Sequence, residues 1–171
     1  MIHRLATSIS AMSLVVVVLS ACHDGSDQKD RAAATRQYDK AKAALATGDL
    51  DEAVSHCRAA IRKRPKWAKA HNLLGMALRA KFFETGDQGY QTAQLAALEK
   101  ATLLAPKWSV AHMNLATTLW RLGKTRQACI EFRKALALDP SHPDKASIDA
   151  QCSAGQEDPH GTGSGGQRRP R

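Results

Sequence analysis

Two segments of the chain repeat each other so closely that they limit the architectures it can adopt. Residues 65–78 read PKWAKAHNLLGMAL, and residues 106–119 read PKWSVAHMNLATTL. Each is followed by a second apolar segment that ends in a proline, at Pro106 and at Pro140. Self-similarity with a period of a few tens of residues is typical of stacked units that bury their apolar faces against one another. We therefore expect a repeat protein.

The most regular unit covers residues 109–140. Its apolar residues recur at three- and four-residue spacing and predict two amphipathic helices. They are Leu115, Leu119 and Leu122, then Ala128, Phe132, Ala135 and Leu136. Gly123 between the two sets allows a tight turn, and Pro140 ends the second helix because proline has no amide donor. The unit is predicted to be one helix–turn–helix hairpin.

A third copy lies upstream, and the second one is longer than the others. Gly48, Ala53, Cys57, Ala60 and Pro65 reproduce the spacing of Gly123, Ala128, Phe132, Ala135 and Pro140. Pro106 and Pro140 are 34 residues apart, whereas Pro65 and Pro106 are 41 apart, which implies an insertion of seven residues. Gly86 and Gly89 predict that it forms a longer turn between the helices, with Phe82 and Phe83 extending the first helix.

The spacing of the last unit resembles the tetratricopeptide repeat family. The matching residues are His112, Leu115, Ala116, Leu119, Gly123, Ala128, Phe132, Ala135 and Pro140. His112 stands where the family usually has Trp, Ala116 replaces a Gly, and Leu119 replaces a Tyr. The resemblance implies an all-α fold, a right-handed solenoid of three helix–turn–helix repeats with disordered termini. The repeats would be residues 34–66, 67–107 and 108–141.

The first 22 residues, MIHRLATSISAMSLVVVVLSAC, have the layout of a secretory signal peptide. The sequence Leu19-Ser20-Ala21-Cys22 also resembles the processing box of bacterial lipoproteins. The resemblance implies cleavage of residues 1–21 and lipidation of Cys22. We expect a chain anchored in the bacterial cell envelope and facing the periplasm, in the outer membrane rather than the inner, since His23 follows the cysteine. The polar residues 22–33 predict a flexible tether.

Residues 142–171 predict a short cap helix around residues 144–150, followed by a disordered tail. A terminal repeat needs a polar cap over its outer apolar side. Because this one is so short, we hypothesise that Leu136 and Leu138 are incompletely covered. They would then mark a surface for a partner or for self-association.

The net charge of +9 falls mainly on the repeats. A basic surface suits acidic protein or anionic lipid headgroups. Predicted export, and the lack of a recognisable nucleic-acid module, argue against nucleic acid.

The family resemblance places the partner-binding residues on the first helix of each repeat, where they would line a concave groove. They are Tyr38, Lys42, Lys69, Asn72, Met76, Arg79, Val110, Met113, Thr117 and Trp120. Aromatic, Met and Arg side chains often dominate protein interfaces. For Trp120 a second interpretation is equally open, in which the ring packs against the tail.

The remaining candidates for chemistry are cysteines and histidines. Cys57 is interpreted as a core residue, and Cys129 and Cys152 as a possible disulfide in an oxidising compartment. His71 and His112 occupy equivalent positions, where packing explains them better than a metal pair, which would need further ligands. The sequence predicts no cofactor, no metal and no catalytic set.

These observations predict a lipid-anchored periplasmic adaptor that binds a protein of an envelope machine. Pilus or secretin assembly, outer-membrane biogenesis and recruitment of cell-wall hydrolases are the pathways that the resemblance suggests. A secretion chaperone, or a redox or metal accessory protein, is the alternative.

Overall fold

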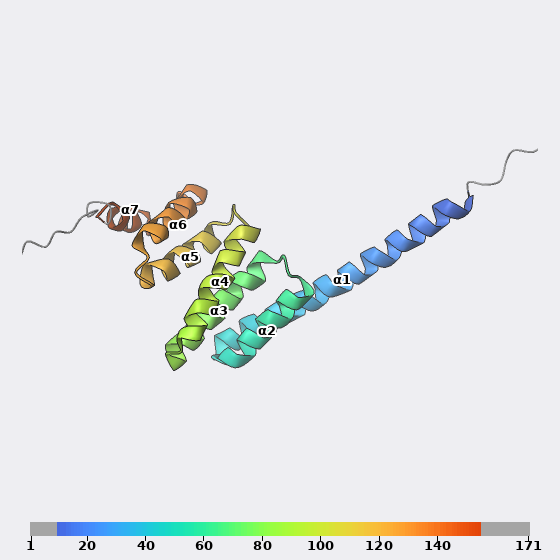
Figure 1. The fold of residues 1–171 in the computed structure, drawn as a ribbon, viewed down its shortest axis with the longest axis horizontal. Coiled ribbons are helices and arrows are strands. Elements are labelled where there is room, and N and C mark those ends of the chain that lie inside the picture. The colour runs from blue at the N-terminus through green and yellow to red at the C-terminus, as the bar shows by residue number, and fades with distance from the viewer. Residues whose placement is uncertain (1–9, 155–171) are drawn as a thin grey trace, which may run out of the picture. The chain divides into compact units, whose positions relative to one another are not determined.

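The computed structural model describes the backbone of residues 10–154 and the side chains of residues 26–153. The predicted signal peptide, the lipidation site at Cys22 and the end of the tail lie outside the described side chains. The described residues form helices and no strand, in the order α1 (Ser10–Thr47), α2 (Leu50–Lys63), α3 (Ala68–Thr85), α4 (Gln88–Leu104), α5 (Ser109–Arg121), α6 (Thr125–Leu138) and α7 (Lys145–Ala154) (Figure 1). The all-α prediction is confirmed.

Three helix pairs follow one another along the chain, each joined by a short turn. The turns of α1–α2 and α5–α6 contain Gly48 and Gly123, with φ of 89° and 71°. Residues other than glycine rarely adopt this left-handed conformation, which explains why glycine recurs at a fixed place in the repeat. The prolines Pro65, Pro106 and Pro140 follow the second helix of each pair, as expected.

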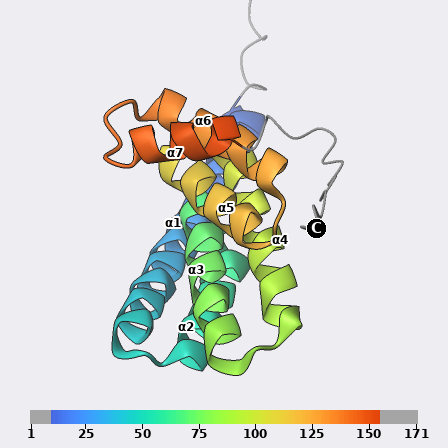
Figure 2. The ribbon, with the colours of Figure 1, turned by 90° about the vertical axis from the view of Figure 1, so that its left-hand side faces the viewer.

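The chain divides into two compact units, residues 1–94 and 95–171, with the boundary inside α4. In unit 1, α2 packs against both α1 and α3 (Figure 2). Its core contains Ala41, Cys57 and Leu73, one residue from each of these helices. Tyr38, Leu45 and Leu74 are partly buried around this core.

In unit 2, α6 packs against both α5 and α7. Its core is larger and collects apolar side chains from α4, α5, α6 and α7. The members are Leu98, Leu115, Ala116, Leu119, Ala128, Cys129, Phe132, Leu136, Ile148 and Cys152. The second half of α4 thus completes the core of the last helix pair.

The seven-residue insertion lengthens the helices rather than the turn, contrary to our prediction. α3 has 18 residues and α4 has 17, whereas α2, α5 and α6 have 13 or 14. Only Gly86 and Asp87 separate α3 from α4, and Gly86 ends α3 in the left-handed conformation, at φ 72°. The extension of α3 through Phe82 and Phe83 is confirmed. Lys81 connects the extended part of α3 to Asp51 at the start of α2, with 3.0 Å between Nζ and Oδ1.

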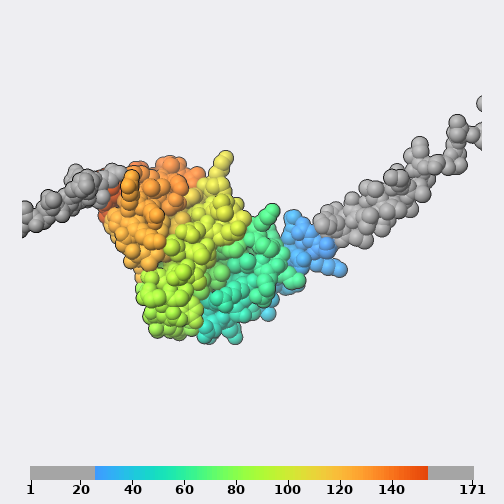
Figure 3. Space-filling view, viewed as in Figure 1, coloured from blue at the N-terminus to red at the C-terminus, as the bar shows by residue number. Residues whose placement is uncertain are grey.

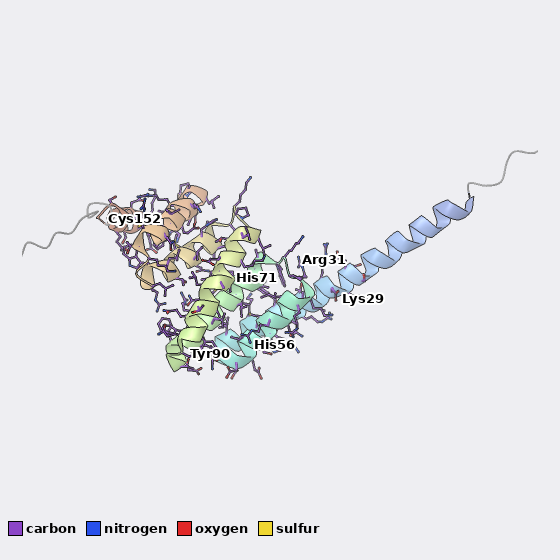
Figure 4. The ribbon with its side chains drawn as sticks, in the orientation of Figure 1. Lys29, Arg31, His56, His71, Tyr90 and Cys152 are labelled. Atoms are coloured by element: carbon purple, nitrogen blue, oxygen red, sulfur yellow. A yellow bond between two sulfur atoms is a disulfide. The ribbon has the colours of Figure 1, made fainter. Side chains whose placement is uncertain are left out.

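Residues 26–33, predicted as a flexible tether, belong to α1 instead. Polar composition does not prevent a helix when charged side chains pair along it. Arg31 binds Asp27 one turn earlier at 2.6 Å, and Lys63 of α2 reaches Asp30 at 3.1 Å. Figure 4 labels Arg31 on this part of α1, and Figure 3 shows the described part of α1, in blue, beside the side chains of α2. Among the helices that could be searched, those with described residues, none is both long and apolar enough to cross a membrane.

The last helix pair is capped by α7, which begins near the predicted position. Ile148 and Cys152 of α7 are buried against α6, and Cys152 forms a disulfide with Cys129 of α6 at a Cα–Cα distance of 5.5 Å. Figure 4 labels Cys152 on this helix. The hypothesis of an uncovered Leu136 is wrong, because only 5% of this side chain is exposed. Leu138 does remain exposed, at 41%.

We expect reduction of this disulfide to destabilise unit 2. A bond between residues 23 positions apart restricts the unfolded chain and stabilises the fold by about 3 kcal/mol in the chain-entropy model. Denaturant unfolding of the wild-type chain should therefore show a lower midpoint with dithiothreitol than without it. The double variant Cys129→Ala/Cys152→Ala should show one midpoint in both conditions. An unchanged wild-type midpoint would contradict the prediction.

Candidate protein-binding site

On α3, the predicted binding residues form a stripe at three- and four-residue spacing. Lys69 is exposed, and 38% of Met76 is exposed, which is high for a large apolar side chain. Arg79 is partly exposed one turn further along the helix. Asn72 does not fit the prediction, since it is only 5% exposed and its amide lies 3.7 Å from the Met76 sulfur. The stripe available to a partner is thus Lys69, Met76 and Arg79.

On α1, the two predicted binding residues, Tyr38 and Lys42, differ in how accessible they are to a partner. Lys42 is exposed. Tyr38 packs against the core of unit 1, with its ring centroid 4.8 Å from that of Trp67. The guanidinium carbon of Arg64 lies over the Trp67 ring, 4.5 Å from the ring centroid. Burial, with smaller contributions from Cys57 and Asp39, raises the pKa of Tyr38 above its usual value. Tyr38 is therefore mainly a packing residue.

In unit 2, Val110 is the exposed residue of the predicted binding set, with an exposed fraction of 49%. Met113 and Trp120 are partly buried against the core of unit 2, and the Trp120 ring lies 6.4 Å from that of Phe132. Thr117 donates a hydrogen bond from Oγ1 to the Met113 carbonyl, at 2.9 Å. The described contact of the Trp120 ring is thus with Phe132 of α6, and the choice between its two interpretations stays open.

The two histidines anchor their helices to the preceding loop. Nε2 of His71 contacts the Pro65 carbonyl at 2.8 Å, and Nε2 of His112 contacts the Pro106 carbonyl at 3.0 Å. The motif Pro-Lys-Trp-x-x-x-His thus has a structural explanation that the sequence analysis missed. Figure 4 labels His71 near the start of α3.

His112 makes a second contact that His71 does not share. Its Nδ1 lies 2.6 Å from a Glu131 carboxylate oxygen of α6, and Lys134 binds the other oxygen at 2.7 Å. Through these two contacts the His112 ring joins α5 both to the preceding loop and to α6. In unit 1, Gln37 and His56 form the corresponding pair, at 2.7 Å, with the histidine on the second helix. These contacts are structural, and no group of side chains in the described part of the chain could hold a metal ion.

Cys57 is the free cysteine of the described residues, and it is fully buried. Burial raises the pKa of its thiol to about 12. The nucleophilic form of cysteine is the thiolate, so a thiol in this environment is inert at neutral pH.

A groove on α2 is a feature that sequence reasoning did not find. Its lining is Asp51, Val54, Ser55, Arg58 and Arg62 of α2 together with Tyr90 of α4, around a cavity of about 380 Å³. The residues of α2 lie at helical spacing along one face, which was visible in the sequence. Tyr90 comes from the insertion, whose conformation the sequence did not reveal.

Comparison with known proteins gives two matches to family profiles, both described as tetratricopeptide repeat. They cover residues 38–81 and 109–142. A search of curated proteins finds no significant match.

Solved structures with this fold include three that span most of the chain. The OM64 TPR domain of Arabidopsis has 21% identity and a TM-score of 0.63, covering 74% of this chain and 98% of that one. The first TPR of Spaghetti (RPAP3), bound to the HSP90 peptide SRMEEVD, has 15% identity and a TM-score of 0.64, covering 74% of this chain and 94% of that one. The Yersinia enterocolitica type III secretion chaperone SycD was solved in complex with a peptide of the translocator YopD. It has 14% identity and a TM-score of 0.59, covering 70% of this chain and 89% of that one.

The ion pair of Glu131 predicts a pH dependence of stability. Burial alone would raise the pKa of this carboxyl, but hydrogen bonds from Lys134 and His112 outweigh burial and lower it. Because the pKa is lower in the folded state than in the unfolded state, the stabilisation is complete above the unfolded value of about 4.3. It is lost as the pH falls through the lower, folded value.

We expect Glu131→Gln to reduce the free energy of unfolding by about 1–2 kcal/mol at pH 7. The difference from the wild type should shrink when urea unfolding is repeated at pH 3. Glu99→Gln, at an exposed position of α4, is the matched control and should have little effect at either pH. A constant difference across this range would contradict the assignment.

Proposed function

Since the chain belongs to the tetratricopeptide repeat family, we propose that it is a lipid-anchored, non-enzymatic adaptor in the bacterial cell envelope. Domains of this family mediate protein–protein interaction. The partner we propose is a protein of an envelope machine for pilus or secretin assembly, outer-membrane biogenesis or cell-wall hydrolase recruitment. The repeats would face the periplasm.

The observation that carries the binding role is the exposed Met76 in the stripe of α3. An exposed methionine between Lys69 and Arg79 offers an adaptable apolar contact flanked by positive charge. Such combinations are typical of protein-binding surfaces. Val110 of α5 provides a second exposed apolar side chain at a predicted binding position.

Two of the structural neighbours support a peptide as the bound species. The Spaghetti (RPAP3) repeat and SycD were both solved with peptides of other proteins. At 15% and 14% identity they share the fold, and their ligands suggest only the class of partner.

The lipid anchor rests on the sequence Leu19-Ser20-Ala21-Cys22 and its preceding apolar run. We expect mass spectrometry of the protein from its native membrane to find an amino-terminal Cys22 that carries acyl chains. Cys22→Ser should leave the precursor unprocessed. Recovery of an unmodified chain that starts at Met1, in the soluble fraction, would support the alternative of a secretion chaperone.

The inert thiol of Cys57 and the bonded pair Cys129–Cys152 support a role without redox catalysis. A redox accessory protein would need an accessible thiolate.

The binding role can be tested by photo-crosslinking in the native cell. A crosslinking amino acid at Met76 or Val110 should capture the same envelope protein. Glu52 on α2 and Arg133 on α6 are exposed controls in units 1 and 2, and neither should capture it. Met76→Glu should abolish copurification of the captured protein without lowering the melting temperature, since the side chain is exposed. Capture of the same species at all four positions would refute the assigned surface.

A further inference from the structure

From the α2 groove, defined above, we infer a second docking site, for an acidic segment of a polypeptide. The groove is lined by residues of α2 and α4, which are second helices of their repeats, and it shares no residue with the α3 stripe proposed to bind the main partner. Asp51 and Arg62 are separated by 11 residues, so the groove runs for about 16 Å at 1.5 Å per residue. This length accommodates about five residues of extended chain.

The insertion forms one end of the groove. Tyr90 lies where α4 begins, beside the end of α3 (Figure 4). Lys81 is 7% exposed and binds Asp51 at 3.0 Å and Glu84 at 2.7 Å, with its Nζ 5.8 Å from the centre of the Tyr90 ring. Hydrogen bonds to Glu84 and Asp51 raise the pKa of Lys81 above its usual value, so the amine stays protonated. The buried ammonium thus contacts Asp51 and lies over the Tyr90 ring at this end.

The lining of the groove carries more positive than negative charge, from Arg58 and Arg62 against Asp51. Asp51 is the one carboxylate in the lining, and Lys81 already binds it. Within the described residues, neither Arg58 nor Arg62 forms an ion pair, although both are exposed. Two arginines at positions i and i+4 of one helix repel each other in the free protein. A bound carboxylate would remove this repulsion and accept paired hydrogen bonds from the guanidinium groups.

The lining favours a polypeptide over a bare anion. Arginine and tyrosine are enriched at protein interfaces, where the tyrosine ring contributes apolar contact and its hydroxyl a hydrogen bond. Ser55, which is exposed between the arginines and Asp51, adds a further hydroxyl that can bind a peptide backbone. The expected ligand is therefore an extended segment that carries Asp or Glu side chains.

This inference depends on the proposed function only in taking the ligand to be a polypeptide. Its test uses the purified chain and a synthetic probe, so its failure leaves the crosslinking result at Met76 unaffected. Likewise, the absence of an envelope partner at Met76 would leave the groove testable.

The experiment measures binding of fluorescein-labelled hexaglutamate to the purified full chain by fluorescence anisotropy at low ionic strength. Arg58→Glu/Arg62→Glu should raise the Kd by at least about tenfold. The matched control Arg126→Glu/Arg133→Glu makes the same charge change at exposed positions of α6 and should change the Kd less than about twofold. Tyr90→Ala should weaken binding severalfold, and labelled hexaglutamine should not bind.

A folding control keeps the result interpretable. Arg58→Gln/Arg62→Gln removes the repulsion between the two arginines, so its melting temperature should equal or exceed that of the wild type, while hexaglutamate binding falls as in the Glu variant. If both double variants bind hexaglutamate like the wild type, or the wild type does not bind it, the inference is wrong. Arginine-dependent binding to phosphatidylglycerol vesicles or to inorganic phosphate, without binding to the peptide, would also overturn it.

Discussion

Close approach of helix backbones at buried alanines is the constraint on which the rest of the structure depends. Ala41, Ala53, Ala60, Ala111, Ala116 and Ala128 are completely buried. Among the residues whose side chains are described, the largest with essentially no exposure are Leu78, Leu98 and Cys57. The helices therefore gain stability from dense contact at these small residues as well as from the burial of larger side chains such as Leu115 and Phe132. A larger residue at any of these crossings would separate two helices and disturb every element that packs on them.

This constraint explains which parts of the fold could be predicted from the sequence. The alanines, the turn glycines and the closing prolines each satisfy a local steric requirement. The hairpins and their order could therefore be predicted from these residues. The longer helices at residues 81–91 could not be predicted, because Gly86 and Gly89 fit either a loop or a tight turn. One contact of the extended helix, from Lys81 to Asp51, joins residues 30 positions apart and leaves no local signal. The helix at residues 26–33 contains a comparable contact, between Lys63 and Asp30.

The candidate binding residues show the same division between local and long-range information. The family resemblance placed Lys69, Met76 and Arg79 on one face of a helix, and all three are at least partly exposed there. It could not reveal that Asn72 turns inward or that Tyr38 stacks on Trp67, since both depend on side chains of other segments. His71 and His112 occupy the place of a packing residue, as expected, but each also binds a carbonyl six residues earlier. Periodicity identifies the face of a helix, whereas contact partners decide what each side chain does there.

The burial of Cys57 bears on how the chain reaches a single covalent form. Disulfides form in oxidising compartments, where any accessible thiol can exchange with a nearby disulfide. Once α1, α2 and α3 enclose it, Cys57 is inert, and Cys129 can pair correctly with Cys152. While unit 1 is unfolded, by contrast, the same thiol competes for either partner. The fidelity of oxidation in one half of the chain thus depends on how early the other half folds, which couples the two halves kinetically during maturation.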